Sequence, residues 1–194
     1  MARENPSDRS ERALANRQGD LHLIIEDIHR DANASGIMRT AEAVGVGTIH
    51  IIKTDGLNQS VLPRVSRGAE RWLEIESHAE PGTCIARLHA QGLAVYCSAV
   101  TPEAVDFRSV DYARPCAIAV GNETEGASGS LAALADEVIM IPMMGLTESL
   151  NVGAAAAVIL YEAQRQRAEA GMYMTQGLDA DAPDNHGGRS PCDT

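Results

Sequence analysis

The chain is poor in aromatic residues, which make up 3% of its 194 residues. Its core must therefore be built from aliphatic side chains, since apolar residues still account for 44% of the sequence. No apolar run reaches the roughly 18 residues that a membrane-spanning helix needs, so we expect no contact with a membrane. Residues 1–20 contain no apolar stretch of the kind found in secretory signals, which indicates a cytoplasmic protein.

Cysteine and histidine are also sparse, and neither shows the spacing of a metal site. The four cysteines lack a C-x-x-C pair, so reduced core thiols are expected at Cys84, Cys97, Cys116 and Cys192. We expect no metal ion at the histidines, which are His22, His29, His50, His78, His89 and His186. The phosphate-binding motifs G-x-G-x-x-G and G-x-x-x-x-G-K-[ST] and the nucleophile elbow G-x-S-x-G are absent as well, which argues against the usual nucleotide and hydrolase sites.

Lysine is nearly absent, because Lys53 is the only one, and the net charge is −11. This balance argues against a protein that binds any polyanion through general charge attraction. The other basic residues are arginines, whose guanidinium group can bind a phosphate through two parallel hydrogen bonds, which a lysine ammonium cannot do. Arg64, Arg67 and Arg71 follow a helical spacing that places them on one face.

Short runs rich in branched residues alternate with segments of helical pattern along most of the chain. Strands are predicted at 21–26, 48–52, 72–76, 93–99, 116–120 and 138–141, and helices at about 7–16, 36–44, 61–68, 81–91, 130–135 and 152–170. Such alternation is typical of an α/β fold with a mostly parallel sheet flanked by helices. We expect residues 1–171 to form one domain with a short N-terminal helix, and the acidic residues 172–194 to be disordered.

The segment from Ile139 to Arg167 combines a strand, a polar corner and the longest predicted helix. Asn151 or Ser149 stands where an N-cap belongs, and Gly171 stands where a C-terminal glycine belongs. A helix N-terminus behind a polar turn can bind an anion or a carboxylate. The small residues at 153–157 allow another backbone to approach this helix closely.

Polar loops follow predicted strands or open helices at 33–39, 121–126 and 145–151. Open α/β sheets bind ligands at the carboxyl ends of their strands, so these loops are the candidate site. Position alone leaves Arg39 equally open to a ligand contact and to a plain surface role. The patterns by themselves do not name a reaction.

Three segments together resemble the TrmH-like (SpoU) branch of the SPOUT superfamily of RNA methyltransferases. Residues 33–41 (NASGIMRTA) are similar to its N-x-x-x-x-x-R-T-A motif, and residues 121–126 (GNETEG) to its G-x-E-x-x-G loop. Residues 141–152 are similar to its I-P-M…S-L-N-V element. The resemblance covers about residues 7–173, and residues 161–173 look especially like the bacterial tRNA guanosine-2′-O-methyltransferases of this branch.

The resemblance implies a SPOUT fold with a deep trefoil knot, formed where the segment from Pro142 onward threads under the loop at Gly121. It also implies a homodimer packed through the last helix. S-adenosylmethionine is the implied cofactor, bound in the knot by residues of three loops. These residues are Ser98, Ala99, Val100, Val120, Gly121, Ile141, Met143 and Leu150.

The implied reaction is 2′-O-methylation of a ribose in RNA, with guanosine 18 in the D-loop of tRNA as the expected target. Another tRNA ribose, an rRNA ribose, or a non-catalytic RNA-binding role are the alternatives. The resemblance gives Arg39 the catalytic role. Because arginine stays protonated, we expect it to position the target phosphate and stabilise the developing alkoxide rather than to act as a base. The supporting residues implied are Asn33, Glu123, Ser149 and Asn151.

Arginines are the expected contacts to the RNA backbone, since such contacts position a substrate without reading its sequence. The candidates are Arg9, Arg12, Arg17, Arg64, Arg67, Arg71, Arg165 and Arg167. Each of them could instead form ion pairs with neighbouring carboxylates. Family members continue after the equivalent of Gly171 into further helical, RNA-binding sequence, whereas this chain has a short acidic tail, so the resemblance does not by itself imply full affinity for tRNA or the same choice of site.

Overall fold

A computed structural model of the protein describes residues 5–53 and 73–174. Seven strands form one sheet in the order β3-β2-β1-β6-β4-β7-β5, and every neighbouring pair is parallel. Their bounds are β1 Gln18–Glu26, β2 Val46–Ile52, β3 Glu74–His78, β4 Ala94–Ser98, β5 Val105–Asp106, β6 Cys116–Val120 and β7 Glu137–Met140. The predicted α/β fold with a parallel sheet is confirmed.

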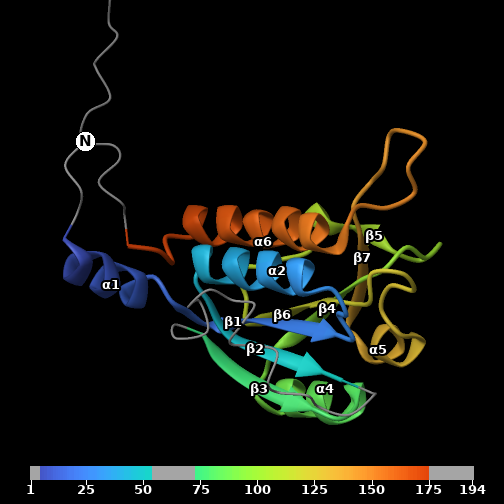
Figure 1. The fold of residues 1–194 in the computed structure, drawn as a ribbon, viewed down its shortest axis with the longest axis horizontal. Coiled ribbons are helices and arrows are strands. Elements are labelled where there is room, and N and C mark those ends of the chain that lie inside the picture. The colour runs from blue at the N-terminus through green and yellow to red at the C-terminus, as the bar shows by residue number, and fades with distance from the viewer. Residues whose placement is uncertain (1–4, 54–72, 175–194) are drawn as a thin grey trace, which may run out of the picture.

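Helices cover both faces of the sheet (Figure 1). They are α1 Pro6–Ala15, α2 Asp31–Ala43, α4 Pro81–Ala90, α5 Gly129–Leu134 and α6 Val152–Glu169, with a 3₁₀ turn η3 at Phe107–Ser109. One core cluster joins the sheet to α2 and α6, and a second joins it to α4 and α5. Both clusters are mainly aliphatic, as the shortage of aromatic residues requires. No helix in the described ranges is at once long and apolar enough to cross a membrane.

The long helix α6 begins and ends where the sequence predicts. The side chain of Asn151 accepts hydrogen bonds from the backbone N–H groups of Gly153 and Ala154, at 3.0 and 3.4 Å. Gly171 ends the segment with a φ of +73°, a conformation that glycine adopts without strain. Of the two predicted N-caps, Asn151 rather than Ser149 is the one that the structure confirms.

Helix α2 differs from its prediction, because it begins at Asp31 and not after Ser35. Ser35, the residue before the predicted helix 36–44 and a possible N-cap for it, therefore lies inside the helix and does not cap it. Arg30 occupies the cap position, but its side chain makes no capping bond. A carboxylate distant in sequence instead fixes the chain just before the helix, because Glu123 accepts hydrogen bonds from the N–H groups of His29 and Arg30.

Three of the predicted core thiols are buried and free: Cys84, Cys97 and Cys116. Burial raises the pKa of Cys84 and of Cys97 to about 12, so both thiols are protonated at neutral pH. Cys192 lies outside the described residues.

Strand β6 lies between β1 and β4, although β4 comes earlier in the chain. The loops that follow β4, β6 and β7 consequently leave the same edge of the sheet side by side. Register pairs Cys97 with Ala119 and Ser98 with Ile139, which brings the ends of these strands level. Ligands of parallel sheets bind at such an edge, where the strand order departs from the chain order.

Candidate functional site

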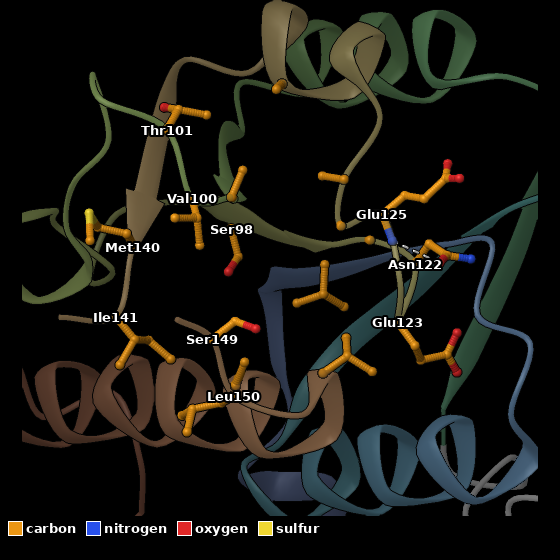
Figure 2. A pocket seen from close by; sticks show the side chains of 18 of the residues that line it. Ser98, Val100, Thr101, Asn122, Glu123, Glu125, Met140, Ile141, Ser149 and Leu150 are labelled. Carbon is orange, nitrogen blue, oxygen red and sulfur yellow. Dashed lines mark hydrogen bonds between the residues drawn. The ribbon is translucent and has the colours of Figure 1, made fainter. Parts of the chain in front are cut away.

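A cavity of about 420 Å³ opens at the carboxyl ends of β4, β6 and β7 (Figure 2). Its size falls within the roughly 300–1,000 Å³ typical of small-molecule sites. The wall mixes apolar and polar residues, and the hydroxyl groups of Ser98 and Ser149 face the same open space. All eight residues predicted to bind a cofactor lie in this wall: Ser98, Ala99, Val100, Val120, Gly121, Ile141, Met143 and Leu150.

Gly121 makes one side of the cavity possible. A Cβ atom at this position would lie 2.2 Å from the backbone N and Cα of Ala127 and 2.3 Å from the carbonyl carbon of Gly126. No side chain can form such contacts, so only glycine lets the loop fold back on itself here. Gly126 closes the same loop with a φ of +75°.

The loop between these two glycines is held rigid by its own hydrogen bonds. The backbones of Asn122 and Gly126 exchange two hydrogen bonds, at 2.9 and 3.0 Å. The Asn122 side chain accepts from the N–H groups of Thr124 and Glu125 and donates to the carbonyl of Asp27. The cavity wall at this loop is therefore preformed rather than shaped by a ligand.

Glu123 extends from this loop away from Ser98 and toward α2 (Figure 2). Its carboxylate accepts three hydrogen bonds, from the N–H of His29 at 3.1 Å, the N–H of Arg30 at 2.9 Å and the Asn33 amide at 3.0 Å. Burial acts to raise the pKa of Glu123, but these hydrogen bonds outweigh it and lower the pKa to about 2. The group is thus ionised and saturated with donors, which suits it to hold α2 and not to accept a proton.

Asn33 continues the connection from Glu123 to α6. Its side-chain oxygen accepts a hydrogen bond of 3.1 Å from the amide of Asn151, and Asn151 caps α6. Glu123, Asn33 and Asn151 thus form a hydrogen-bond relay that ends at the N-terminus of α6. The direction of the hydrogen bonds in this relay is determined at both ends, because a carboxylate can only accept and a helix N-terminus can only donate. Each asparagine must therefore turn its NH₂ toward Glu123 and its oxygen toward α6.

Arg39 lies on α2 with an exposed side chain and is not part of the cavity wall. Its guanidinium has no hydrogen bond or ion pair with any residue in the described part of the chain. Ser149 lines the cavity, whereas Asn33 and Asn151 lie behind its wall. The predicted site residues thus divide into three groups: those around the cavity, those in the relay, and Arg39, whose guanidinium binds none of the described residues.

The arginines predicted to bind RNA fall into different environments. Arg64, Arg67 and Arg71, as well as the side chain of Arg9, lie outside the described residues. Arg12 is exposed on α1, and the half-buried Arg17 donates to the carbonyl of Val46 at 2.8 Å. Arg165 is exposed on α6 and pairs with Glu162 and Glu169.

The prediction that Arg167 contacts RNA is wrong. Its side chain is 0% exposed, and all five of its N–H groups are used inside the protein. They bind the Asp20 carboxylate at 2.6 Å, the Gln18 side chain and the carbonyls of Asp20, Tyr112 and Arg114. The helical spacing that places a residue on α6 does not reveal that this face of the helix lies against β1.

Glu26, at the end of β1, is a positioning residue that the sequence analysis missed. It is 2% exposed, and its carboxylate accepts from both the N–H and the hydroxyl of Ser128, at 2.7 and 2.6 Å. Ser128 in turn caps α5, of which Gly129 and Ala132 line the cavity. The available signal was an acidic residue that ends an otherwise apolar strand, since such a charge is buried only when it is paired.

Comparison with known protein families shows which family the chain belongs to. Residues 20–161 match the model described as the SpoU rRNA Methylase family. The chain belongs to this SpoU family. The matched region contains the cavity loops, the relay and Arg39.

Individual SpoU proteins agree with this assignment. The tRNA (guanosine(18)-2′-O)-methyltransferase of Escherichia coli (strain K12) is 42% identical over 163 residues, which are 84% of this chain and 71% of that protein. The crystal structure of the TrmH/SpoU tRNA modifying enzyme of A. aeolicus matches with a TM-score of 0.80 and 37% identity, over 86% of this chain and 84% of that one. The SpoU methyltransferase AviRb of Streptomyces viridochromogenes, solved with AdoMet, matches with a TM-score of 0.69 and 27% identity, over 87% and 67%.

Proposed function

We propose that this SpoU protein transfers a methyl group from S-adenosylmethionine to a ribose 2′-hydroxyl of RNA, and that its substrate is guanosine 18 in the D-loop of tRNA. The observation that carries the proposal is the cavity formed by three loops at the ends of β4, β6 and β7. Two of these loops contain family motifs, and the relay ties them to the third motif on α2. The relative from E. coli bears the name of this activity.

The residues of the cavity fit the proposed cofactor. Gly121 lets the loop fold back on itself to form one wall of the cavity, and Val100, Ile141 and Leu150 offer apolar contacts. The hydroxyls of Ser98 and Ser149 are among the polar groups that can fix the orientation of a ligand in such a site. When bound, S-adenosylmethionine supplies an electrophilic methyl group on a sulfonium centre.

The chain's own residues would then bind and orient the RNA. Arg39, a permanent cation without a partner among the described residues, would contact the phosphate beside the target ribose and stabilise charge developing on the 2′-oxygen. Glu123, Asn33 and Asn151 would act as positioning residues, because their polar atoms already bind one another. They hold the α2 segment that bears Arg39 against the cavity loop and the start of α6.

A deep trefoil knot and a homodimer belong to the same proposal. The relay supports the knot, since it joins the segment after β7 to the loop after β6 through Asn33. Exposed apolar side chains support a dimer that packs on α6 and the loop before it. These are Met144, Leu146, Leu150, Val158 and Tyr161.

We further propose that the chain forms one SPOUT domain acting in the cytoplasm, with the acidic tail after residue 174 outside it. Residues 172–174, which were predicted to be disordered, pack on the domain: the Tyr173 hydroxyl donates to the carbonyl of Val44 at 2.7 Å, and the N–H of Met174 donates to the Asn16 side chain at 2.8 Å. Arg12 and the arginines at 64, 67 and 71 would contact the tRNA backbone. Arg165 would do so only by leaving its two glutamate partners. The acidic tail would weaken binding to RNA through its negative charge.

Methyl transfer to defined RNAs tests the proposal. The protein is incubated with radiolabelled S-adenosylmethionine and a tRNA transcript, alongside the same tRNA made with 2′-deoxyguanosine at position 18. Label should enter the first RNA and not the second. Equal labelling of both would overturn the choice of nucleotide. An rRNA fragment is tested in parallel, and labelling of this fragment instead of the tRNA would favour an rRNA substrate. Absence of both labelling and S-adenosylmethionine binding by calorimetry would leave only a non-catalytic RNA-binding role.

A further inference from the structure

Three buried histidines form a ladder across the edge of the sheet farthest from β5. His22, His50 and His78 lie on β1, β2 and β3, and successive members are 28 positions apart in the sequence. His22 Nδ1 lies 2.8 Å from His50 Nε2, and His50 Nδ1 lies 3.0 Å from His78 Nε2. Neighbouring ring centroids are 5.1 and 5.2 Å apart. The sequence shows no metal-site spacing at these histidines, and only the pairing of β1, β2 and β3 as parallel neighbours brings them together.

The end of the ladder determines which nitrogen of each ring carries a proton. His22 Nε2 lies 3.1 Å from the carbonyl oxygen of Gly19, which can only accept, so this nitrogen is the donor. His22 Nδ1 must then accept from His50 Nε2. As a neutral ring, His50 therefore presents the bare lone pair of its Nδ1 toward His78.

Two further ligand atoms meet at this lone pair. The Oε2 atom of Glu76 is buried and has no hydrogen-bond partner among the described residues, although it lies 3.5 Å from His50 Nδ1 and 3.8 Å from His78 Nε2. Its other oxygen binds Arg87 at 2.7 Å. The Cys84 thiol is fully buried in the first turn of α4. Its sulfur and one ring nitrogen each of His50 and His78 all lie within 4.8 Å of one another.

We propose that His50, His78, Cys84 and Glu76 form a zinc site at the junction of β2, β3 and α4. Zinc takes nitrogen, thiolate and carboxylate ligands in a tetrahedron, and bonds of about 2.0–2.3 Å imply edges of about 3.3–3.6 Å between ligand atoms. The separations of 3.0, 3.5 and 3.8 Å among the two nitrogens and the carboxylate oxygen already bracket these edges. The thiol lies no more than 4.8 Å from the ring nitrogens of the two histidines, so it must approach them by up to about 1 Å to join the tetrahedron.

The surroundings suit a metal ion better than they suit the bare cluster. A buried carboxylate oxygen without a donor is costly, and a cation removes that cost. His22 accepts a hydrogen bond from His50 Nε2 at 2.8 Å and so points the Nδ1 lone pair of His50 toward the site, as outer hydrogen-bond partners do for metal-bound histidines.

The site would be structural, because none of its four ligands lines the cavity and all four positions are taken by the protein. It would join the edge strand β3 to its neighbour and to α4. On binding, the Cys84 thiol loses its proton to solvent, and His78 moves its proton to Nδ1. The inference does not depend on the proposed methyl transfer, since it concerns the opposite edge of the sheet.

Cobalt substitution tests the site, because a cobalt-bound thiolate has a distinctive charge-transfer absorption. The full chain is used with Cys192→Ala, so that a thiol outside the described residues does not contribute, and it is freed of metal and reduced. Cys84→Ala is compared with Cys97→Ala, which alters an equally buried thiol of the same core cluster. We expect one equivalent of Co²⁺ to produce the band in the parent and in Cys97→Ala, but not in Cys84→Ala.

Zinc should displace the cobalt from the parent. The dissociation constant for zinc should be at least about 100-fold larger in Cys84→Ala than in the parent. If Cys84→Ala does not fold, His78→Gln should keep a thiolate band but bind at least about 10-fold more weakly. The proposal is overturned if the parent shows no thiolate band at one equivalent, if the band survives in Cys84→Ala, or if binding does not saturate at one metal per chain.

Discussion

The amide of Asn151 donates a hydrogen bond of 3.1 Å to the side-chain oxygen of Asn33, 118 residues earlier in the chain. This contact joins the start of α6 to the first turn of α2, and Asn33 passes the connection on to Glu123. Three motifs that are far apart in the sequence are thereby held as one unit behind the cavity. The arrangement explains why these residues must be amides and a carboxylate at these places.

Asn33→Asp would place a second carboxylate against Glu123. The lost hydrogen bond to a charged group should cost about 2 kcal/mol of stability at neutral pH, and methyl transfer should fall with it. Urea unfolding and initial rates measure the two effects. Asn16→Asp is the matched control, since the Asn16 amide faces a backbone carbonyl and should tolerate the change within about 1 kcal/mol. Equal stability of both variants would contradict the relay.

The acid branch of the stability curve should depend on Glu123. Its pKa of about 2 in the folded protein lies below the ordinary 4.5, so its stabilising effect is complete above about pH 4.5 and is lost as the pH falls toward 2. Glu123→Gln should flatten the dependence of unfolding free energy on pH in that window. Glu125→Gln, an exposed neighbour on the same loop, should leave the slope unchanged. An unchanged slope in Glu123→Gln would show that its three hydrogen bonds do not favour the ionised form.

Gly121→Ala should be among the most damaging small substitutions in the chain. Its Cβ would meet the Ala127 backbone at 2.2 Å, and backbone cannot move aside as a side-chain end can, so a loss of about 3 kcal/mol is expected. Thermal unfolding measures this loss. Gly82→Ala on α4, where nothing lies within 4 Å of the new methyl group, should be neutral or stabilising by about 0.5 kcal/mol.

Arg39→Ala should separate activity from stability. The side chain is exposed and makes no bond with the described residues, so the unfolding midpoint should not move. If it stabilises charge at the reacting oxygen, kcat/KM for tRNA should fall about 10²–10³-fold. Arg114→Ala, another exposed arginine, should retain near-normal rates. Full activity of Arg39→Ala would remove its proposed role.

The two arginines near the end of α6 should behave oppositely. Arg167→Met leaves Asp20 and three carbonyls without their donor and should cost about 3–5 kcal/mol. Arg165→Ala removes only exposed ion pairs and should cost at most about 1 kcal/mol. Chemical denaturation of both variants provides the comparison. Similar losses for the two would be inconsistent with the burial of Arg167.

Local chemistry in the sequence was enough to predict most of the elements and part of the site. Branched runs marked the strands, and Asn151 and Gly171 marked the ends of α6 because capping depends on neighbours in the chain. The glycines at 121 and 126 and the family motifs pointed to the loops that form the cavity. Those loops lie together because strand ends in a parallel sheet share one edge.

Tertiary structure decided what depends on partners distant in sequence. Helix α2 starts at Asp31 and not after Ser35, and Glu123 fixes the chain just before this start by binding the N–H groups of His29 and Arg30. Arg167 is buried because its face of α6 lies on β1, which helical spacing alone does not show. The histidine ladder exists because β1, β2 and β3 are neighbours in register, and strand order is a property of the folded sheet.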